Sequence, residues 1–166
     1  MIDRNMIGDR GEAMFYLAIS KLHGDRPLFR PVHLGGKWPT ADLTVELDGE
    51  PGMFFLVQVK TGTRGYTPDG KRLLLATDLA KLQLLADAPL PTYLVGVDEP
   101  LENVYFSALH GKVVGSASIC MSYSAQDADV RVRLYNEVKE FWDGVRANRP
   151  WKASQFVDPQ REEEPK

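Results

Sequence analysis

The residues that could do chemistry in this chain lie on two short runs with strand-like alternation. Asp42 belongs to the run at 41–47, and Gln58 and Lys60 belong to the run at 54–63. Side chains two apart on a strand share a face, so Gln58 and Lys60 point the same way. An acid beside a Gln-x-Lys pair could hold a divalent cation through side-chain oxygens. The lysine could orient a water molecule or balance the charge of a phosphate.

The segment between these runs, 48–52, is rich in turn-forming residues and predicts a hairpin. A turn centred on Glu50 places position 42 opposite 58 and position 43 opposite 57. In that register the odd-numbered apolar residues of both runs meet on one face. A slip of one residue would bury polar groups, so we expect this register to be strongly favoured.

The same register should bring Asp42, Gln58 and Lys60 together on the other face, with opposed Cβ atoms roughly 5 Å apart. Asp42 would supply a carboxylate, Gln58 an amide oxygen, and Val59 its backbone carbonyl as a further ligand. The alternative is that these polar side chains are simply the solvated face of an antiparallel sheet.

Glu12 could complete this group. It lies in a predicted helix at 8–23, on the same stripe as Phe15 and Ile19. Buried carboxylates are rare unless they are paired or bound to a metal, so the helix could direct Glu12 towards Asp42. Alternatively, Glu12 stays hydrated and complements the helix dipole. His33 stands outside these motifs, and we assign it a core or surface role.

The composition is that of a globular protein of 166 residues with a formal net charge of −3. Cys120 is the single cysteine, which excludes an internal disulfide and favours a cytoplasmic protein. No apolar run reaches the roughly 20 residues that span a bilayer, and the N-terminus lacks the apolar segment of a signal peptide. We expect one domain at 1–150 and a polar, disordered tail at 151–166.

The element pattern predicts an α/β fold in which helices flank a mixed central β-sheet. Segments 62–71 and 111–126 are expected to be a loop and a region without clear assignment. The predicted helices are 8–23, 77–86 and 129–147, and the predicted strands are 28–34, 41–47, 54–63, 92–97 and 104–109.

In order and spacing, these motifs resemble the PD-(D/E)XK nuclease superfamily, which has a restriction-endonuclease-like core. The likeness covers roughly residues 5–110 and is greatest to a bacterial domain-of-unknown-function branch. The segments that carry it are 10–19 (RGEAMFYLAI), 42–47 (DLTVEL), 55–61 (FLVQVKT) and 89–97 (PLPTYLVGV). Ala41 stands where the superfamily has proline, and Gln58 stands where it usually has an acid.

The resemblance implies an enzyme that hydrolyses DNA phosphodiester bonds with Mg²⁺ or Mn²⁺. Glu12 and Asp42 would be metal ligands, Gln58 a residue of the metal site, and Lys60 the catalytic lysine. The replacement of the acid at 58 leaves open a catalytically inactive relative that binds nucleic acid or a protein partner. RNA also remains open as a substrate, and so does a homodimer built on the apolar stripe of the last helix.

Cationic residues near the end of the second run could contact the nucleic acid. These are Arg64, Lys71 and Arg72, and Tyr66 between them could stack on a base. The alternative is an ordinary solvated loop.

Overall fold

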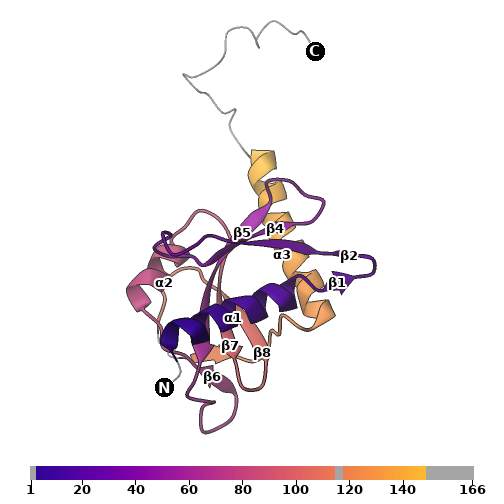
Figure 1. Cartoon of the computed structure of the whole chain (residues 1–166). Coiled ribbons are helices and arrows are strands. Elements are labelled where there is room, and N and C mark those ends of the chain that lie inside the picture. The colour runs from indigo at the N-terminus through magenta and orange to yellow at the C-terminus, as the bar shows by residue number, and fades with distance from the viewer. Residues whose placement is uncertain (1–2, 115–117, 149–166) are drawn as a thin grey trace, which may run out of the picture.

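The chain is described by a computed structural model for residues 3–114 and 118–148. Its centre is a five-stranded mixed sheet with the strand order β3-β4-β5-β7-β8 (Figure 1). The parallel pair is β5 and β7, and the other neighbours are antiparallel. The strands are β3 (Phe29–His33), β4 (Leu43–Leu47), β5 (Phe54–Gly62), β7 (Thr92–Asp98) and β8 (Asn103–Ala108). The predicted mixed sheet flanked by helices is therefore confirmed.

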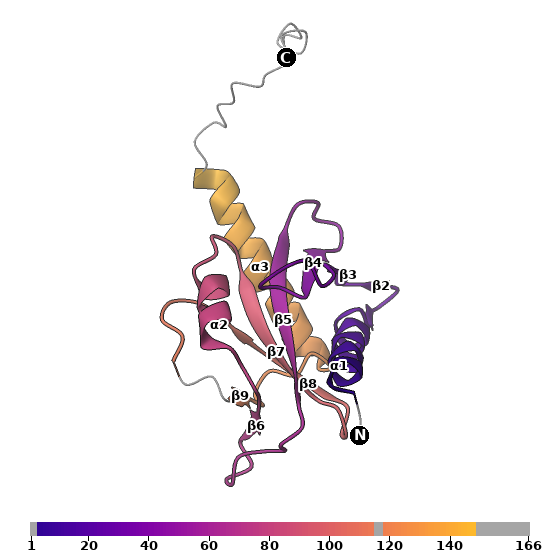
Figure 2. The ribbon, with the colours of Figure 1, turned by 60° about the vertical axis from the view of Figure 1, so that its left-hand side comes forward.

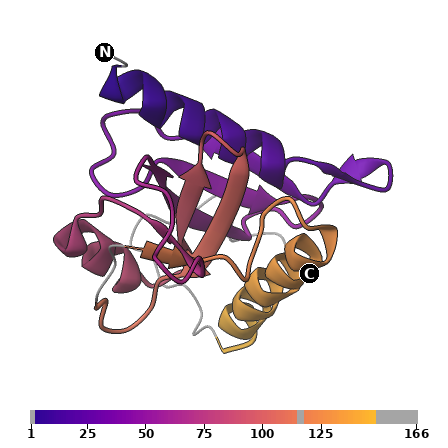
Figure 3. The same ribbon diagram turned by 90° about the horizontal axis from the view of Figure 1, so that it is seen from below.

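Both faces of the sheet are partly covered. The helices α1 (Arg4–Ile19) and α3 (Ala128–Asn148) contribute buried residues to one core cluster, together with the odd-numbered residues of β4 and β5. The second cluster joins α2 (Leu79–Ala86) to a small sheet of β6 (Arg72–Leu74) and β9 (Ser118–Cys120). Figures 2 and 3 show α1 and α2 on opposite sides of the central strands.

The first helix is displaced from its predicted range of 8–23. It starts at Arg4 because the Asp3 side chain caps it by accepting a hydrogen bond from the Asn5 N–H at 3.0 Å. It ends at Ile19, and Leu22 lies beyond it with 64% of its surface exposed. The following residues form the short pair β1 (Leu22–His23) and β2 (Arg26–Pro27).

The remaining predicted helices and strands begin and end within two residues of their predicted bounds. Asp78 caps α2, because its side chain accepts a hydrogen bond from the Ala80 N–H at 3.0 Å. The three-residue strands β6 and β9 were not predicted, because a strand this short has too few residues to show a periodicity of two. The tail at 151–166 lies outside the described residues, and the domain limit at 150 remains a prediction.

The register of the β4–β5 hairpin is the predicted one. Leu43 pairs with Val57 and Val45 with Phe55, which places their side chains in the first core cluster. The ladder ends at Leu43 and Val57, one pair short of positions 42 and 58. Within 3–114 and 118–148, no helix has the length and apolar character needed to cross a membrane.

Candidate active site

The candidate site lies where β4 and β5 separate. The Asp42 N–H still donates to the Val57 carbonyl at 2.9 Å, but its carboxylate oxygen Oδ2 accepts the Val59 N–H at 2.6 Å. The side chain thus replaces a backbone carbonyl of β4 as the partner of β5. The N–H and C=O of one strand residue point to the same edge, so the Val59 carbonyl also faces this gap.

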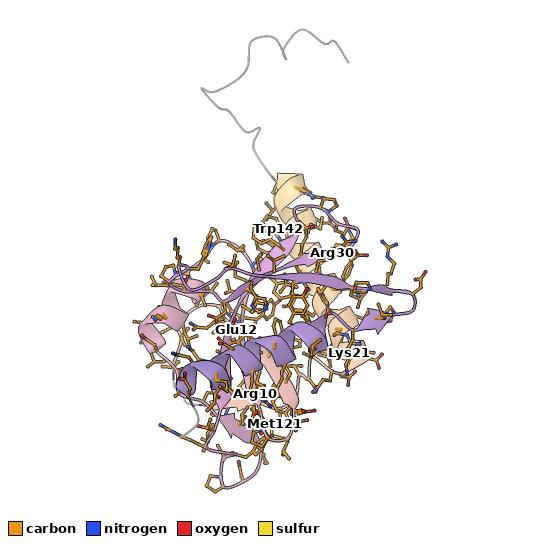
Figure 4. All side chains as sticks on the ribbon, viewed as in Figure 1. Arg10, Glu12, Lys21, Arg30, Met121 and Trp142 are labelled. Atoms are coloured by element: carbon orange, nitrogen blue, oxygen red, sulfur yellow. The ribbon has the colours of Figure 1, made fainter. Side chains whose placement is uncertain are left out.

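Glu12 reaches the gap from α1, which packs closely on β5. A Cβ atom at Gly11 would lie 2.0 Å from Thr61 Oγ1, so only glycine permits this approach. Thr61 Oγ1 also donates to the Ile7 carbonyl at 3.2 Å. Glu12 and Arg10 lie on opposite sides of α1, with Glu12 towards the strands (Figure 4).

Both carboxyl groups have a raised pKa. Burial raises the pKa of Glu12, and the neighbouring Asp42 charge raises it further. Burial also raises the pKa of Asp42, although the Val59 N–H and the charges of Lys60 and Lys81 oppose this. The surrounding protein therefore compensates these two negative charges incompletely, which a bound cation would correct.

Gln58 has a buried side-chain oxygen without a hydrogen bond in the described part of the chain. Its side chain is 4% exposed, and its Oε1 atom finds no hydrogen-bond donor anywhere in the described parts of the chain. Such an oxygen costs about 1–3 kcal/mol unless water or a cation satisfies it. Gln58 directly precedes Val59, whose N–H donates to Asp42.

Lys60 is half-buried two residues further along β5, on the same face as Gln58. Its charge lowers the pKa of Asp42, which places the two groups near each other. Lys60 Nζ forms no hydrogen bond or ion pair with any other residue that the structure describes. Electrostatic interactions thus link Asp42 to Glu12 and to Lys60, and Gln58 shares a face of β5 with Lys60.

The candidate ligands are all oxygen atoms. Among residues 3–114 and 118–148, no three His, Cys, Asp or Glu side chains converge to hold a metal. A structural zinc site would need such a group, usually with Cys or His. Magnesium needs only one or two carboxylates, because waters and substrate oxygens complete its shell. The donors present here fit Mg²⁺ or Mn²⁺ better than zinc.

The sequence analysis missed the role of His33. Its Nδ1 atom lies 3.1 Å from Glu12 Oε2, and its ring stacks on Tyr16 with the centroids 5.5 Å apart. His33 therefore fixes the orientation of Glu12 and is not an isolated residue. The missing information was the β3–β4 register, which places His33 opposite Leu43 and beside Asp42.

The cationic residues after β5 have different environments. Arg72 donates to Ser118 Oγ at 2.7 Å and to the Ser118 carbonyl at 3.1 Å, which ties β6 to β9. The Tyr66 hydroxyl donates to Asp98 and its ring packs on the second core, and its stacking on a base remains a prediction. Arg64 and Lys71 are exposed, and their contact with nucleic acid remains a prediction.

A comparison with solved structures finds a similar arrangement in a bacterial homing endonuclease, I-Ssp6803I. The TM-score is 0.54 at 13% sequence identity, over 89% of this chain and 100% of that chain. The chain has a nuclease-like fold. At this identity the likeness concerns the fold alone. No protein-family model and no curated protein matches the sequence.

Proposed function

We propose that this protein is a metal-dependent nuclease of the PD-(D/E)XK type, which hydrolyses phosphodiester bonds of DNA. The main support is the convergence of Glu12 and Asp42, both with a raised pKa, beside the unpartnered oxygen of Gln58. Of these residues, Asp42 stands where β4 and β5 separate, in a chain with a nuclease-like fold.

The residues have distinct proposed roles. Asp42, Glu12, Gln58 and the Val59 carbonyl would hold Mg²⁺ or Mn²⁺. The bound ion would act as a Lewis acid and lower the pKa of a water molecule. Lys60 would orient the attacking water and balance the charge that develops on the phosphate. His33 would keep Glu12 in position through the contact between Nδ1 and Oε2.

A second candidate is a catalytically inactive protein of the same fold that binds nucleic acid or a protein partner. The observation that favours it is the presence of two carboxylates, where a third acid in place of Gln58 would hold the cation more strongly. This protein would bind DNA without cleaving it, whether or not Mn²⁺ is present.

The test compares Lys60→Ala with the parent and with Lys21→Ala, a matched exposed lysine that follows the C-terminal end of α1, away from Glu12 (Figure 4). Cleavage of plasmid and oligonucleotide DNA is followed in Mn²⁺. We expect Lys60→Ala to lose about a hundredfold or more in rate, because water orientation and phosphate stabilisation are both lost. Lys21→Ala should cleave like the parent.

Metal binding is measured on the same proteins by thermal unfolding. Mn²⁺ at about 100 times its Kd should raise the melting temperature of the parent by roughly 5–10 °C. The nuclease proposal fails if Lys60→Ala cleaves as fast as the parent. DNA binding without cleavage, in a parent protein whose melting temperature Mn²⁺ does not change, would favour the inactive candidate.

A further inference from the structure

Lys81 stands on α2, on the face of the sheet that also carries Gln58. Leu82 and Leu85 anchor this helix, and both are buried. Leu82 shares the second core cluster with Leu94, which is the cross-strand neighbour of Gln58 in the β5–β7 ladder. The residue before Leu82 is therefore held close to the strands that carry the candidate site.

Contacts of Gln83 determine which way Lys81 faces. The Gln83 amide donates to the Gly111 carbonyl at 3.0 Å, and its Oε1 accepts the Val113 N–H at 2.9 Å. These contacts turn that flank of α2 towards the segment that follows the edge strand β8. Lys81 is two residues earlier and about 200° away around the helix, so it lies on the opposite flank, towards β5 and β4. Its charge acts on the Asp42 carboxylate.

Lys81 has no fixed anionic partner of its own. The side chain is exposed, and no hydrogen bond or ion pair joins it to another part of the described chain. Lys60, whose charge also acts on Asp42, has no such partner in 3–114 and 118–148 either. Two free ammonium groups thus flank a pair of carboxylates that a metal ion would neutralise. With the ion bound, the lysines would present excess positive charge, which suits a polyanion.

We propose that Lys81 binds a substrate phosphate next to the one that is cleaved, and so fixes the path of the strand between α2 and β4. This inference rests on the proposed nuclease function. The ammonium group is a compact, hydrated point charge, so the contact would be made to the phosphate and not to a base. Lys81 would therefore contribute affinity without sequence preference.

The experiment measures binding of a duplex oligonucleotide in Mn²⁺ over a range of salt concentrations. All the variants compared carry Lys60→Ala, because this substitution should leave the DNA intact during the binding measurement. Adding Lys81→Ala should reduce the slope of log K against log salt by about 0.9. Affinity should fall roughly eightfold at about 0.1 M salt and stay unchanged when extrapolated to about 1 M. Lys81→Arg should retain the full slope.

Lys112→Ala in the same background is the matched control, since Lys112 is also exposed but lies between Gly111 and Val113, on the Gln83 flank of α2. Its slope should equal that of the background. The inference is overturned if Lys81→Ala leaves the slope unchanged, or if Lys112→Ala lowers it equally. If the parent neither binds nor cleaves DNA, the proposed function fails. If the parent cleaves but Lys81→Ala has no effect on the slope, only this inference is lost.

Discussion

Asp42 and Asp48 lie at the two ends of β4 and differ in how their charge is balanced. Asp48 is 8% exposed, and its carboxylate accepts from Arg26 Nε at 2.9 Å and from Arg30 Nε. Arg30 is the main reason that the pKa of Asp48 lies below its ordinary value. Asp42 accepts from one backbone N–H among the residues that the structure describes, and burial raises its pKa.

The difference separates a structural acid from a candidate metal ligand. Asp48 holds the turn after β4 to the start of β3, and its two oxygens already have cationic partners. Asp42 is next to a second acid, Glu12, and to cations that form no ion pair with it. Partial burial is common to both residues, so burial alone does not indicate function. Incomplete charge compensation is the feature that distinguishes Asp42.

The largest expected contrast is in cleavage. Asp42→Asn should lower the rate of DNA cleavage by at least about a hundredfold, because it removes a charged metal ligand. Asp48→Asn should cleave at nearly the parent rate per folded molecule, since Asp48 is at the other end of β4. Rates are measured in Mn²⁺ at a temperature where both variants are folded. Equal losses in the two variants would contradict the comparison.

The second contrast is in stability without metal, and its direction follows from the two pKa shifts. The pKa of Asp48 is lower in the folded protein than in the unfolded chain. Its ionised carboxylate therefore stabilises the fold at pH values above the unfolded-state pKa, and this stabilisation is lost as pH falls through the folded-state pKa. The raised pKa values of Asp42 and Glu12 have the opposite effect. Their contribution to the free energy of unfolding is complete below the pKa of the unfolded chain. It is lost as pH rises through the pKa of the folded protein.

We therefore expect Asp48→Asn to lower the melting temperature by several degrees near neutral pH. Asp42→Asn should raise it slightly in chelator, because the repulsion with Glu12 is removed. It should also flatten the loss of stability as pH increases above about 4. Thermal unfolding at a series of pH values measures both effects. A clear loss of stability for Asp42→Asn at neutral pH would show that its charge is already compensated.

The smallest contrast concerns Gln58. Gln58→Glu adds a third acid to the site, so Mn²⁺ should bind more tightly, by about tenfold. The same change should destabilise the metal-free protein, since another buried carboxylate lacks a partner. Isothermal titration with Mn²⁺ measures the first effect and thermal unfolding in chelator the second. Unchanged Mn²⁺ affinity would place Gln58 outside the metal site.

The sequence was sufficient for the features that depend on neighbours along the chain. Alternation in the two runs predicted the hairpin and its register, because any other register buries polar groups. It thereby placed Gln58 and Lys60 on one face. The predicted position of Glu12 relied on the expectation that a helix would pack on this sheet, which the structure bears out.

The features that could not be predicted depend on how separate elements dock. The partnership of His33 with Glu12 requires both the β3–β4 register and the position of α1. The direction of Lys81 depends on contacts of α2 with a segment 28 residues further along the chain. The contact of Tyr66 with Asp98 could not be predicted for the same reason, since Asp98 lies at the end of a distant strand.

The most direct test of the central claim is anomalous scattering from crystals grown with Mn²⁺. We predict a peak between Glu12 and Asp42, with carboxylate oxygens of both residues at about 2.1 Å and the Gln58 amide oxygen turned towards it. Asp48 should carry no ion, because its oxygens are bound by arginine. Carboxylates of Glu12 and Asp42 that remain free of metal at saturating Mn²⁺ would contradict the account.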